Sequence, residues 1–149
     1  MKLNIKEIAL FLCLTTFSAL AQSSVTTEQL IKQIYLVNEY QNKVLMKGST
    51  IADADALFNM YSHDFIYVHE QYGGEYTKQH LYNNTIKYLK GGQYNYSTDR
   101  YTIVNIIPGR KSVAVQRLQL ARQPDEKAEY HLAVFEFEGL KIKRITEYW

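Results

Sequence analysis

The segment ALFNMYSHDFIYVH, residues 56–69, contains the change of pattern that decides the fold. Its first half has apolar residues at helical spacing, which predicts a short helix from about Asp53. The inward-facing positions of this helix are expected to be Leu57, Phe58 and Tyr61. Residues 62–64 interrupt the spacing, and residues 65–69 then alternate as a strand does. The sequence therefore predicts a helix that runs directly into a strand.

A longer helix is predicted before this segment. Thr26 and Gln29 have the spacing of a capping box, in which each side chain hydrogen-bonds the backbone of the other residue. Gly48 is the expected end of the helix. The apolar residues between them that follow helical spacing are Leu30, Ile34, Val37 and Val44.

A third helix is predicted after the strand. Gly73 and Gly74 form a turn, and Thr77 is the expected N-cap of a helix that reaches Leu89. A second pair of glycines, residues 91–92, then ends this helix.

The remaining chain is rich in β-branched and aromatic residues, with segments of period two that are typical of strands. Tight turns are predicted at Pro108-Gly109 and at Glu138-Gly139. The predicted strands cover residues 94–107, 112–121, 128–137 and 140–148. Helices followed by an antiparallel meander indicate an α+β fold. We expect three N-terminal helices packed in the concave face of a strongly curved antiparallel sheet, which leaves a pocket between helices and sheet.

The N-terminus has the pattern of an export signal. Lys2 and Lys6 precede a short apolar run, residues 8–20, and residues 19–21 fit a small-x-small cleavage site. We therefore predict a signal peptide over residues 1–21 and a single domain over residues 22–149. The expected location is periplasmic or secreted, with no membrane partner after cleavage. Cys13, which is the only cysteine, would be removed with the signal.

The composition excludes several classes of partner and cofactor. The formal net charge is +2, and near-neutral chains have no electrostatic reason to bind nucleic acid. The histidines lack the close spacing of a metal site, so neither a metal nor a cofactor is expected. The 13 tyrosines are the unusual feature, since tyrosine combines a large apolar ring with one polar group and suits cavity walls and interfaces equally.

At this point the chain resembles the NTF2-like superfamily, which includes SnoaL-like polyketide cyclases and ketosteroid isomerases. The residues that carry the resemblance are ALFNMYSHDFIYVH, GGEYTKQHLYN at 73–83 and FEFEGLKIKRITEYW at 135–149. The resemblance covers the chain from about residue 26 onward. It implies a cone-shaped fold with a pocket at its open end, and often a homodimer formed through the sheet. It does not imply one activity, because this fold hosts isomerases, dehydratases, cyclases, carriers and association modules.

Enzymes of this fold mostly perform acid–base chemistry, which needs a positioned base. The aspartates all fall at predicted caps, turns or strand ends, which argues against the aspartate base of a ketosteroid isomerase. A base, if there is one, must be histidine or glutamate. His69 is the first candidate, because it shares a strand face with Tyr67 near the expected pocket mouth. The alternative is a histidine hydrogen-bonded to backbone at the rim, with Tyr67 as core packing.

Glu147 is the second candidate, because it places one carboxylate on an otherwise apolar strand face. An ion pair with Arg144 or Arg117 is the competing interpretation for this residue. Arg117 lies in a mostly apolar row, where a charge must be paired or must bind an anionic ligand. His131 shares a face with Phe135 and is interpreted either as lining the pocket or as an interface residue.

The sequence therefore predicts an exported protein that binds a small, largely apolar or aromatic molecule in its cone. In an enzymatic version, which stays open, His69 or Glu147 moves a proton and a tyrosine such as Tyr67 stabilises an oxyanion. The remaining predicted ligand-binding residues are Tyr72, Arg117, His131, Phe135 and Trp149. The alternative is a non-catalytic carrier or a dimeric association module.

Overall fold

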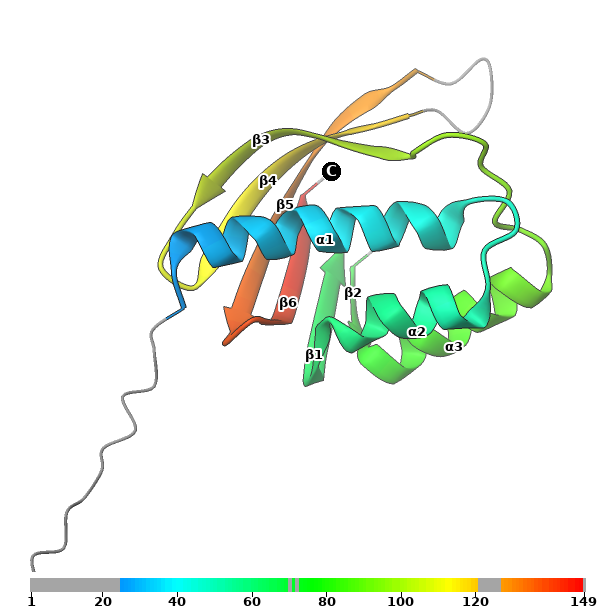
Figure 1. The fold of residues 1–149 in the computed structure, drawn as a ribbon, viewed down its shortest axis with the longest axis horizontal. Coiled ribbons are helices and arrows are strands. Elements are labelled where there is room, and N and C mark those ends of the chain that lie inside the picture. Colours follow the sequence, from blue (N-terminus) through cyan, green and yellow to red (C-terminus); the bar gives the residue numbers. More distant parts are fainter. Residues whose placement is uncertain (1–24, 70, 72, 121–126, 149) are drawn as a thin grey trace, which may run out of the picture.

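The protein was analysed as a computed structural model that describes residues 25–69, 71, 73–120 and 127–148. Within these ranges, three helices and six strands follow one another (Figure 1). The predicted signal peptide and the predicted site residues Tyr72 and Trp149 lie outside the described residues. The elements are α1 (Thr27–Leu45), α2 (Ile51–Asn59), β1 (Tyr61–His69), β2 (Gly74–Thr77), α3 (Lys78–Lys90), β3 (Tyr101–Pro108), β4 (Ser112–Gln119), β5 (Glu129–Glu138) and β6 (Lys141–Tyr148).

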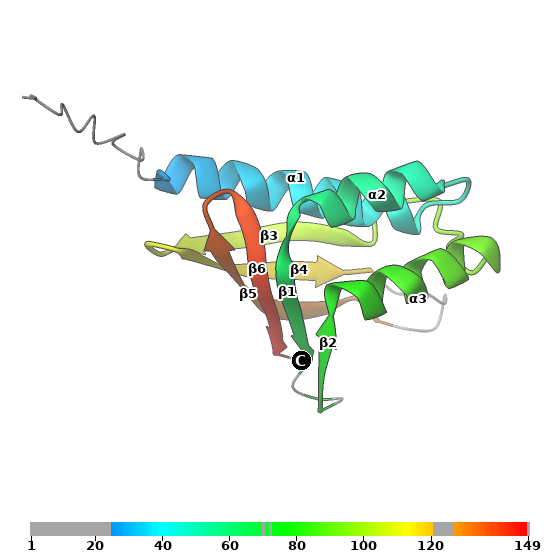
Figure 2. The ribbon, with the colours of Figure 1, turned by 90° about the horizontal axis from the view of Figure 1, so that it is seen from below.

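The strands form one curled sheet in the order β2-β1-β6-β5-β4-β3. Figure 2 shows how strongly the sheet bends, since β3 and β4 run nearly across the direction of β1 and β6. The α+β class and the curled sheet are confirmed, but the prediction of a purely antiparallel sheet is wrong. β1 and β6 pair in parallel, whereas every other pair of neighbours is antiparallel. β6 lies beside β1 on the side opposite to β2. Parallel pairing needs a long connection between the two strands, and here the connection contains β2, α3 and three further strands.

The prediction that all three helices are N-terminal is also only partly correct. α1 and α2 precede the sheet, while α3 follows the β1–β2 hairpin. Both N-terminal helices begin with a capping box, the predicted one at Thr26 and a second one at Thr50. The predicted cap at Thr77 is present as well, with its side chain accepting a hydrogen bond from the backbone N–H of His80.

The boundary between α2 and β1 differs from the expectation. Residues 62–64 belong to the strand, and Tyr61 is its first residue rather than the last inward position of the helix. Tyr61 pairs with Ile142 of β6, and the register then shifts before Ile66. A bulge of this kind lets a strand absorb irregular residues without leaving the sheet.

The core lies between α1, α2 and the concave face of the sheet (Figure 1). α1 packs against α2, β3 and β4, whereas α3 packs against α2, β1 and β2. The buried side chains include Leu30, Ile34 and Val37 of α1 together with Val113 and Val115 of β4. No helix in the described part of the chain is long and apolar enough to cross a membrane.

Candidate functional site

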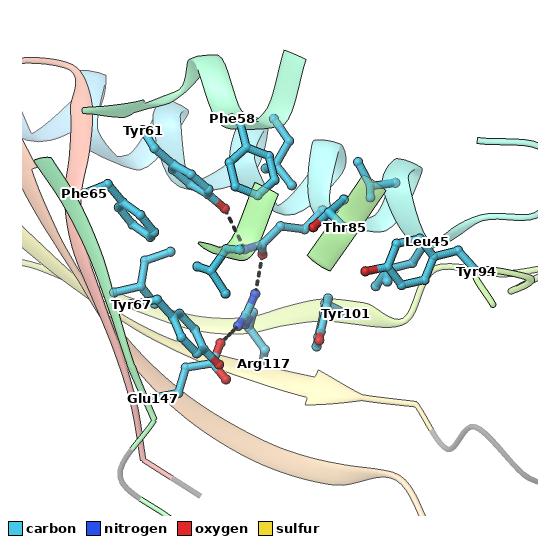
Figure 3. A pocket seen from close by; sticks show the side chains of 15 residues that line it. Leu45, Phe58, Tyr61, Phe65, Tyr67, Thr85, Tyr94, Tyr101, Arg117 and Glu147 are labelled. Carbon is cyan, nitrogen blue, oxygen red and sulfur yellow. Dashed lines mark hydrogen bonds and ion pairs between the residues drawn. The ribbon is translucent and has the colours of Figure 1, made fainter. Parts of the chain in front are cut away.

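A cavity of about 300 Å³ lies between the three helices and the concave face of the sheet (Figure 3). Most of its wall is aromatic or aliphatic. The aromatic residues are Phe58, Tyr61, Phe65, Tyr67, Tyr94 and Tyr101. Four polar side chains complete the lining, namely Gln41, Thr85, Arg117 and Glu147. Three of the predicted site residues line this cavity: Tyr67, Arg117 and Glu147.

Arg117 and Glu147 form a buried ion pair at the sheet side of this cavity. The guanidinium Nη2 donates to Glu147 Oε1 at 2.6 Å, and the two side chains are 2% and 9% exposed. The two residues belong to β4 and β6, which are separated in the sheet by β5. The strand between them contributes Ala133, which pairs with Glu147 and lies diagonal to Arg117. Because alanine has only a methyl group, the arginine side chain has room to reach across it.

The ion pair continues into a chain of hydrogen bonds. Arg117 Nη1 donates to Gln41 Oε1 at 2.7 Å, and Gln41 Nε2 donates to the Tyr61 hydroxyl at 3.3 Å (Figure 3). Arg117 Nε is buried and has no hydrogen-bond partner among the described residues. The chain thus connects α1, the start of β1 and the two charged residues of the sheet.

Tyr67 forms the other end of this chain. Its hydroxyl hydrogen-bonds Glu147, and burial together with the nearby carboxylate raises the pKa of Tyr67 well above its usual range. Burial likewise raises the pKa of Tyr61. Both phenols are therefore protonated at neutral pH and can act as hydrogen-bond donors.

Tyr101 covers the face of the guanidinium. Its ring centroid lies 4.5 Å from Arg117 Cζ, which is the geometry of a cation–π contact. The backbone of Tyr101 is fixed by α1. Asn42, which is 3% exposed, donates from Nδ2 to the Tyr101 carbonyl at 2.8 Å and accepts from the Tyr101 N–H at 2.9 Å. Asn38 Nδ2 also donates to the Tyr101 carbonyl, at 3.1 Å. Two side-chain amides of α1 thus take the place of a neighbouring strand at the start of β3.

His69 lies next to Glu147, but it does not line the cavity. The two residues are direct partners in the parallel β1–β6 pair. His69 is 4% exposed, and its ring centroid is 6.2 Å from that of Tyr67. The structure therefore brings three predicted catalytic residues together, His69, Tyr67 and Glu147, with only the last two facing the cavity.

His131 and Phe135 are buried on β5 and lie outside the cavity lining. His131 pairs with Arg117 across the sheet, and its Nε2 is 3.7 Å from Glu129 Oε2. Burial lowers the pKa of His131, an effect partly offset by the charges of Glu147 and Glu129. The Phe135 ring centroid is 5.7 Å from Arg117 Cζ, which is within the range of a cation–π contact.

The sequence left open whether Glu147 pairs with Arg117 or with Arg144. Glu147 is paired with Arg117, whereas Arg144 forms a separate and more exposed pair with Glu75 at 3.1 Å.

No group of three His, Cys, Asp or Glu side chains within the described ranges could hold a metal ion.

Among the residues that contact Arg117 or extend its hydrogen-bond chain, sequence reasoning missed three: Gln41, Tyr61 and Tyr101. One signal was available for Gln41. It continues the spacing of the buried apolar residues of α1, which are Leu30, Ile34, Val37 and Val44. A glutamine at an inward position of an amphipathic helix needs a buried partner. Tyr61 and Tyr101 carry no comparable signal, because their positions depend on strand boundaries.

Comparison with known proteins supports the fold. No protein-family model and no curated protein sequence matches this chain. Solved structures do match over most of its length. An NTF-2 like protein of unknown function from Burkholderia xenovorans has a TM-score of 0.59 at 15% identity, covering 81% of this chain and 82% of the other. A protein with a cystatin-like fold from Methylobium petroleophilum has a TM-score of 0.62 at 11% identity, covering 84% and 78%.

A third structure is a hypothetical protein with a ketosteroid isomerase-like fold from Catenulispora acidiphila, solved in complex with trimethylamine. It has a TM-score of 0.52 at 13% identity and covers 76% of this chain and 84% of the other. At these identities the likeness concerns the fold. Together with the helices packed on a curled six-stranded sheet, these likenesses show that the chain has the NTF2-like fold.

Proposed function

We propose that the protein binds a small, largely apolar or aromatic molecule in the cavity between its helices and its sheet. The observation that carries this proposal is the contrast within the cavity wall. Apart from Thr85, the polar side chains of the wall belong to one hydrogen-bonded chain, Tyr61–Gln41–Arg117–Glu147–Tyr67, and the rest of the wall is aromatic or aliphatic. Ligand sites in proteins typically combine a mainly apolar wall with a few fixed polar groups that orient the ligand.

The size of the cavity supports the same proposal. A volume of about 300 Å³ is at the lower end of the range for small-molecule sites. It suits a compact molecule of one or two rings better than a long chain. The structure of the same fold from Catenulispora acidiphila was solved with trimethylamine, which is also a compact molecule.

Thr85→Phe tests the proposal. Thr85 lies on α3 and lines the cavity, so a phenyl ring at this position would fill part of the space. Native mass spectrometry of gently purified protein should detect a retained small molecule in the unaltered chain and not in this variant. Lys87→Phe places the same ring on an exposed position of the same helix and should retain the molecule. Equal retention by both variants would contradict the proposal.

An acid–base enzyme is a second candidate, favoured by the hydrogen bond between Tyr67 and Glu147 at the cavity wall. In this version Glu147 exchanges a proton with the bound molecule and Tyr67 stabilises the charge that develops. His69, beside Glu147 in the sheet, would hold the carboxylate in position. Turnover that survives in both Glu147→Gln and His69→Ala would exclude this candidate.

A carrier or dimeric association module is the alternative, and the outer face of the sheet supports it. Tyr130, Leu132 and Tyr148 on β5 and β6 are 64%, 44% and 48% exposed. We propose that a second copy of the chain covers these residues. Sedimentation analysis of Leu132→Asp against unaltered protein tests this part, because a charge at the centre of such an interface would favour the monomer.

Export to the periplasm or the medium is part of the proposal and rests on residues 1–21. The mass of the exported protein should correspond to a chain that begins at Gln22. Retention of Met1 on the exported protein would contradict it.

A further inference from the structure

We infer that residues 74–90, which form β2 and α3, open together while the rest of the fold stays intact, and that this opening uncovers the cavity. We call these residues the β2–α3 segment. The inference goes beyond ligand binding, because it concerns the protein whether or not the cavity is occupied. Segments open locally when they bury few apolar side chains and are weakly attached to their neighbours.

α3 is the least buried helix in the described part of the chain. All 13 of its residues are described and none of them is buried, whereas α1 buries five residues and α2 buries three. Leu81, Ile86 and Leu89 on its apolar face are partly buried against the core. β2 adds little attachment, since within the described sheet it is an edge strand of four residues that pairs with β1 alone. Figure 2 shows α3 running on from β2 at this edge of the sheet.

α3 also faces a hollow on each of two sides. Leu81 and Thr85 line the cavity of about 300 Å³ between the helices and the sheet. Tyr82 and Ile86 line a hollow of about 670 Å³ between α3 and α2, whose lining also includes Ile51. Protein interiors are normally packed without voids of this size, so a helix that separates two hollows has fewer van der Waals contacts with its neighbours.

Polar contacts attach the first half of α3 to the remaining fold. The Tyr82 hydroxyl donates to Asp55 Oδ1 at 2.7 Å, and Lys78 Nζ donates to the Tyr61 carbonyl at 2.9 Å. The first contact is exposed and the second is partly buried, so water can replace both when the segment opens. Contacts of this kind favour the closed state by a small free energy, and removing one of them should make opening more frequent.

The chain is fixed on both sides of the β2–α3 segment, with a glycine at each boundary. Before the segment, β1 lies inside the sheet between β2 and β6. After it, the Tyr96 N–H donates to the Leu45 carbonyl at 3.2 Å, and the Tyr96 carbonyl accepts from the Lys47 N–H at 2.9 Å. Gly73 and Gly92 both have a φ of 66°, which glycine adopts without strain. Backbone rotation at these two glycines can therefore move the segment while its neighbours stay in place.

Thiol labelling tests the inference. In a chain that carries Cys13→Ser, Val44→Cys and Val37→Cys each place a single thiol on α1, at positions that are 3% and 0% exposed. Val44 lines the cavity and Val37 does not. With an aromatic disulfide reagent that reacts slowly compared with reclosing, the labelling rate is proportional to the open fraction. We expect Val44→Cys to be labelled at least about tenfold faster than Val37→Cys, which global unfolding alone exposes.

Two substitutions distinguish this opening from global unfolding. Tyr82→Phe removes the hydrogen bond to Asp55 and keeps the ring, and it should accelerate labelling of Val44→Cys by about fivefold. Ile142→Val is the matched control, because Ile142 is 0% exposed on β6 and lies outside both the segment and the cavity lining. It destabilises a core that stays intact in the open state. Ile142→Val should therefore accelerate labelling of Val37→Cys by about fivefold and leave that of Val44→Cys within about twofold.

Amide hydrogen exchange of the unaltered protein checks the extent of the opening. The amides of β2 and of α3 should have similar protection, at least about tenfold below that of the buried part of α1. β2 is included because Lys78 of α3 directly follows Thr77 of β2, so the helix cannot move away without the strand.

Three results would overturn the inference. Equal labelling of Val44→Cys and Val37→Cys would mean that the cavity is reached only by global unfolding. An unchanged rate in Tyr82→Phe would mean that the reagent enters by another route. Exchange of the α3 amides while the β2 amides stay protected would refute the joint opening. None of these results decides whether the cavity holds a ligand, which Thr85→Phe tests separately.

Discussion

Replacing Arg117 by methionine should destabilise the protein strongly, although it removes no large part of the apolar core. The change leaves the Glu147 carboxylate, 9% exposed, without its cation, and it leaves the Gln41 oxygen without its donor. Removing one partner of a buried ion pair costs about 3–5 kcal/mol. We expect the lower half of this range, because the Tyr67 hydroxyl still hydrogen-bonds Glu147 and the cavity admits some solvent.

The double variant Arg117→Met/Glu147→Gln isolates the cause. It removes both charges, so the unfolding free energy should recover by about 2 kcal/mol or more relative to Arg117→Met alone. Urea denaturation of the four proteins of this cycle measures the coupling. For a chain of this size, a loss of about 3 kcal/mol corresponds to a decrease of roughly 12 °C in the melting temperature.

The matched control is Arg144→Met. It breaks the Arg144–Glu75 pair, in which the side chains are 36% and 65% exposed, and should cost less than about 1 kcal/mol. If Arg117→Met costs as little as this control, burial of the first pair has no energetic consequence. The reasoning applied to the site would then be refuted.

Three further predictions concern pH and the local supports of the fold. Burial lowers the pKa of His131 below 6.5, so the unfolded chain binds this proton more readily than the folded one. His131 therefore does not reduce the unfolding free energy above pH 6.5. Below pH 6.5 the unfolding free energy should decrease, by at most about 1.4 kcal/mol per pH unit. Urea titrations between about pH 8 and pH 5 should show a shallower decrease in His131→Asn, and an identical slope would contradict the assignment. Asn42→Ala removes two hydrogen bonds to the Tyr101 backbone but leaves the one from Asn38 Nδ2 to the Tyr101 carbonyl at 3.1 Å, so it should cost about 1 kcal/mol in the same assay; a cost below about 0.5 kcal/mol would mean that water or Asn38 replaces the lost bonds. Thr50→Ala removes the N-cap of α2 and should cost about 1 kcal/mol in thermal unfolding, whereas no change would mean that Asp53 alone caps the helix.

The local parts of the fold could be predicted from the sequence because their signals are local. The capping box at Thr26, the N-cap at Thr77 and the hairpin turn at Gly139, where φ is 60°, each depend on a few adjacent residues. The parallel pairing of β1 with β6 joins segments about 80 residues apart, and no short pattern encodes it. β2 was missed because its four residues include a glycine and alternate too briefly to give a strand signal.

The site shows the same difference between features with a local signal and features that depend on long-range strand pairing. The ion pair between Arg117 and Glu147 was one of the interpretations open from the sequence, because two charges in apolar rows need partners. Their distance from His69 could not be judged without the register of β1 against β6. Tyr61 was assigned to a helix, so its hydroxyl could not be placed in the cavity at all. Only the strand that begins at this residue puts it there.

The parallel pairing of β1 with β6 also has a consequence for how the protein folds. Hairpins such as β5–β6 can close early, because the loops that they close are short. The contacts of β1 with β6 have a large sequence separation, and contacts of this kind slow folding. Arg117 and Glu147 can meet once β4, β5 and β6 have assembled, whereas Tyr67 reaches the carboxylate only when β1 docks. Completion of the polar chain and closure of the sheet should therefore be one kinetic event, and Tyr67→Phe should accelerate unfolding more than it slows refolding.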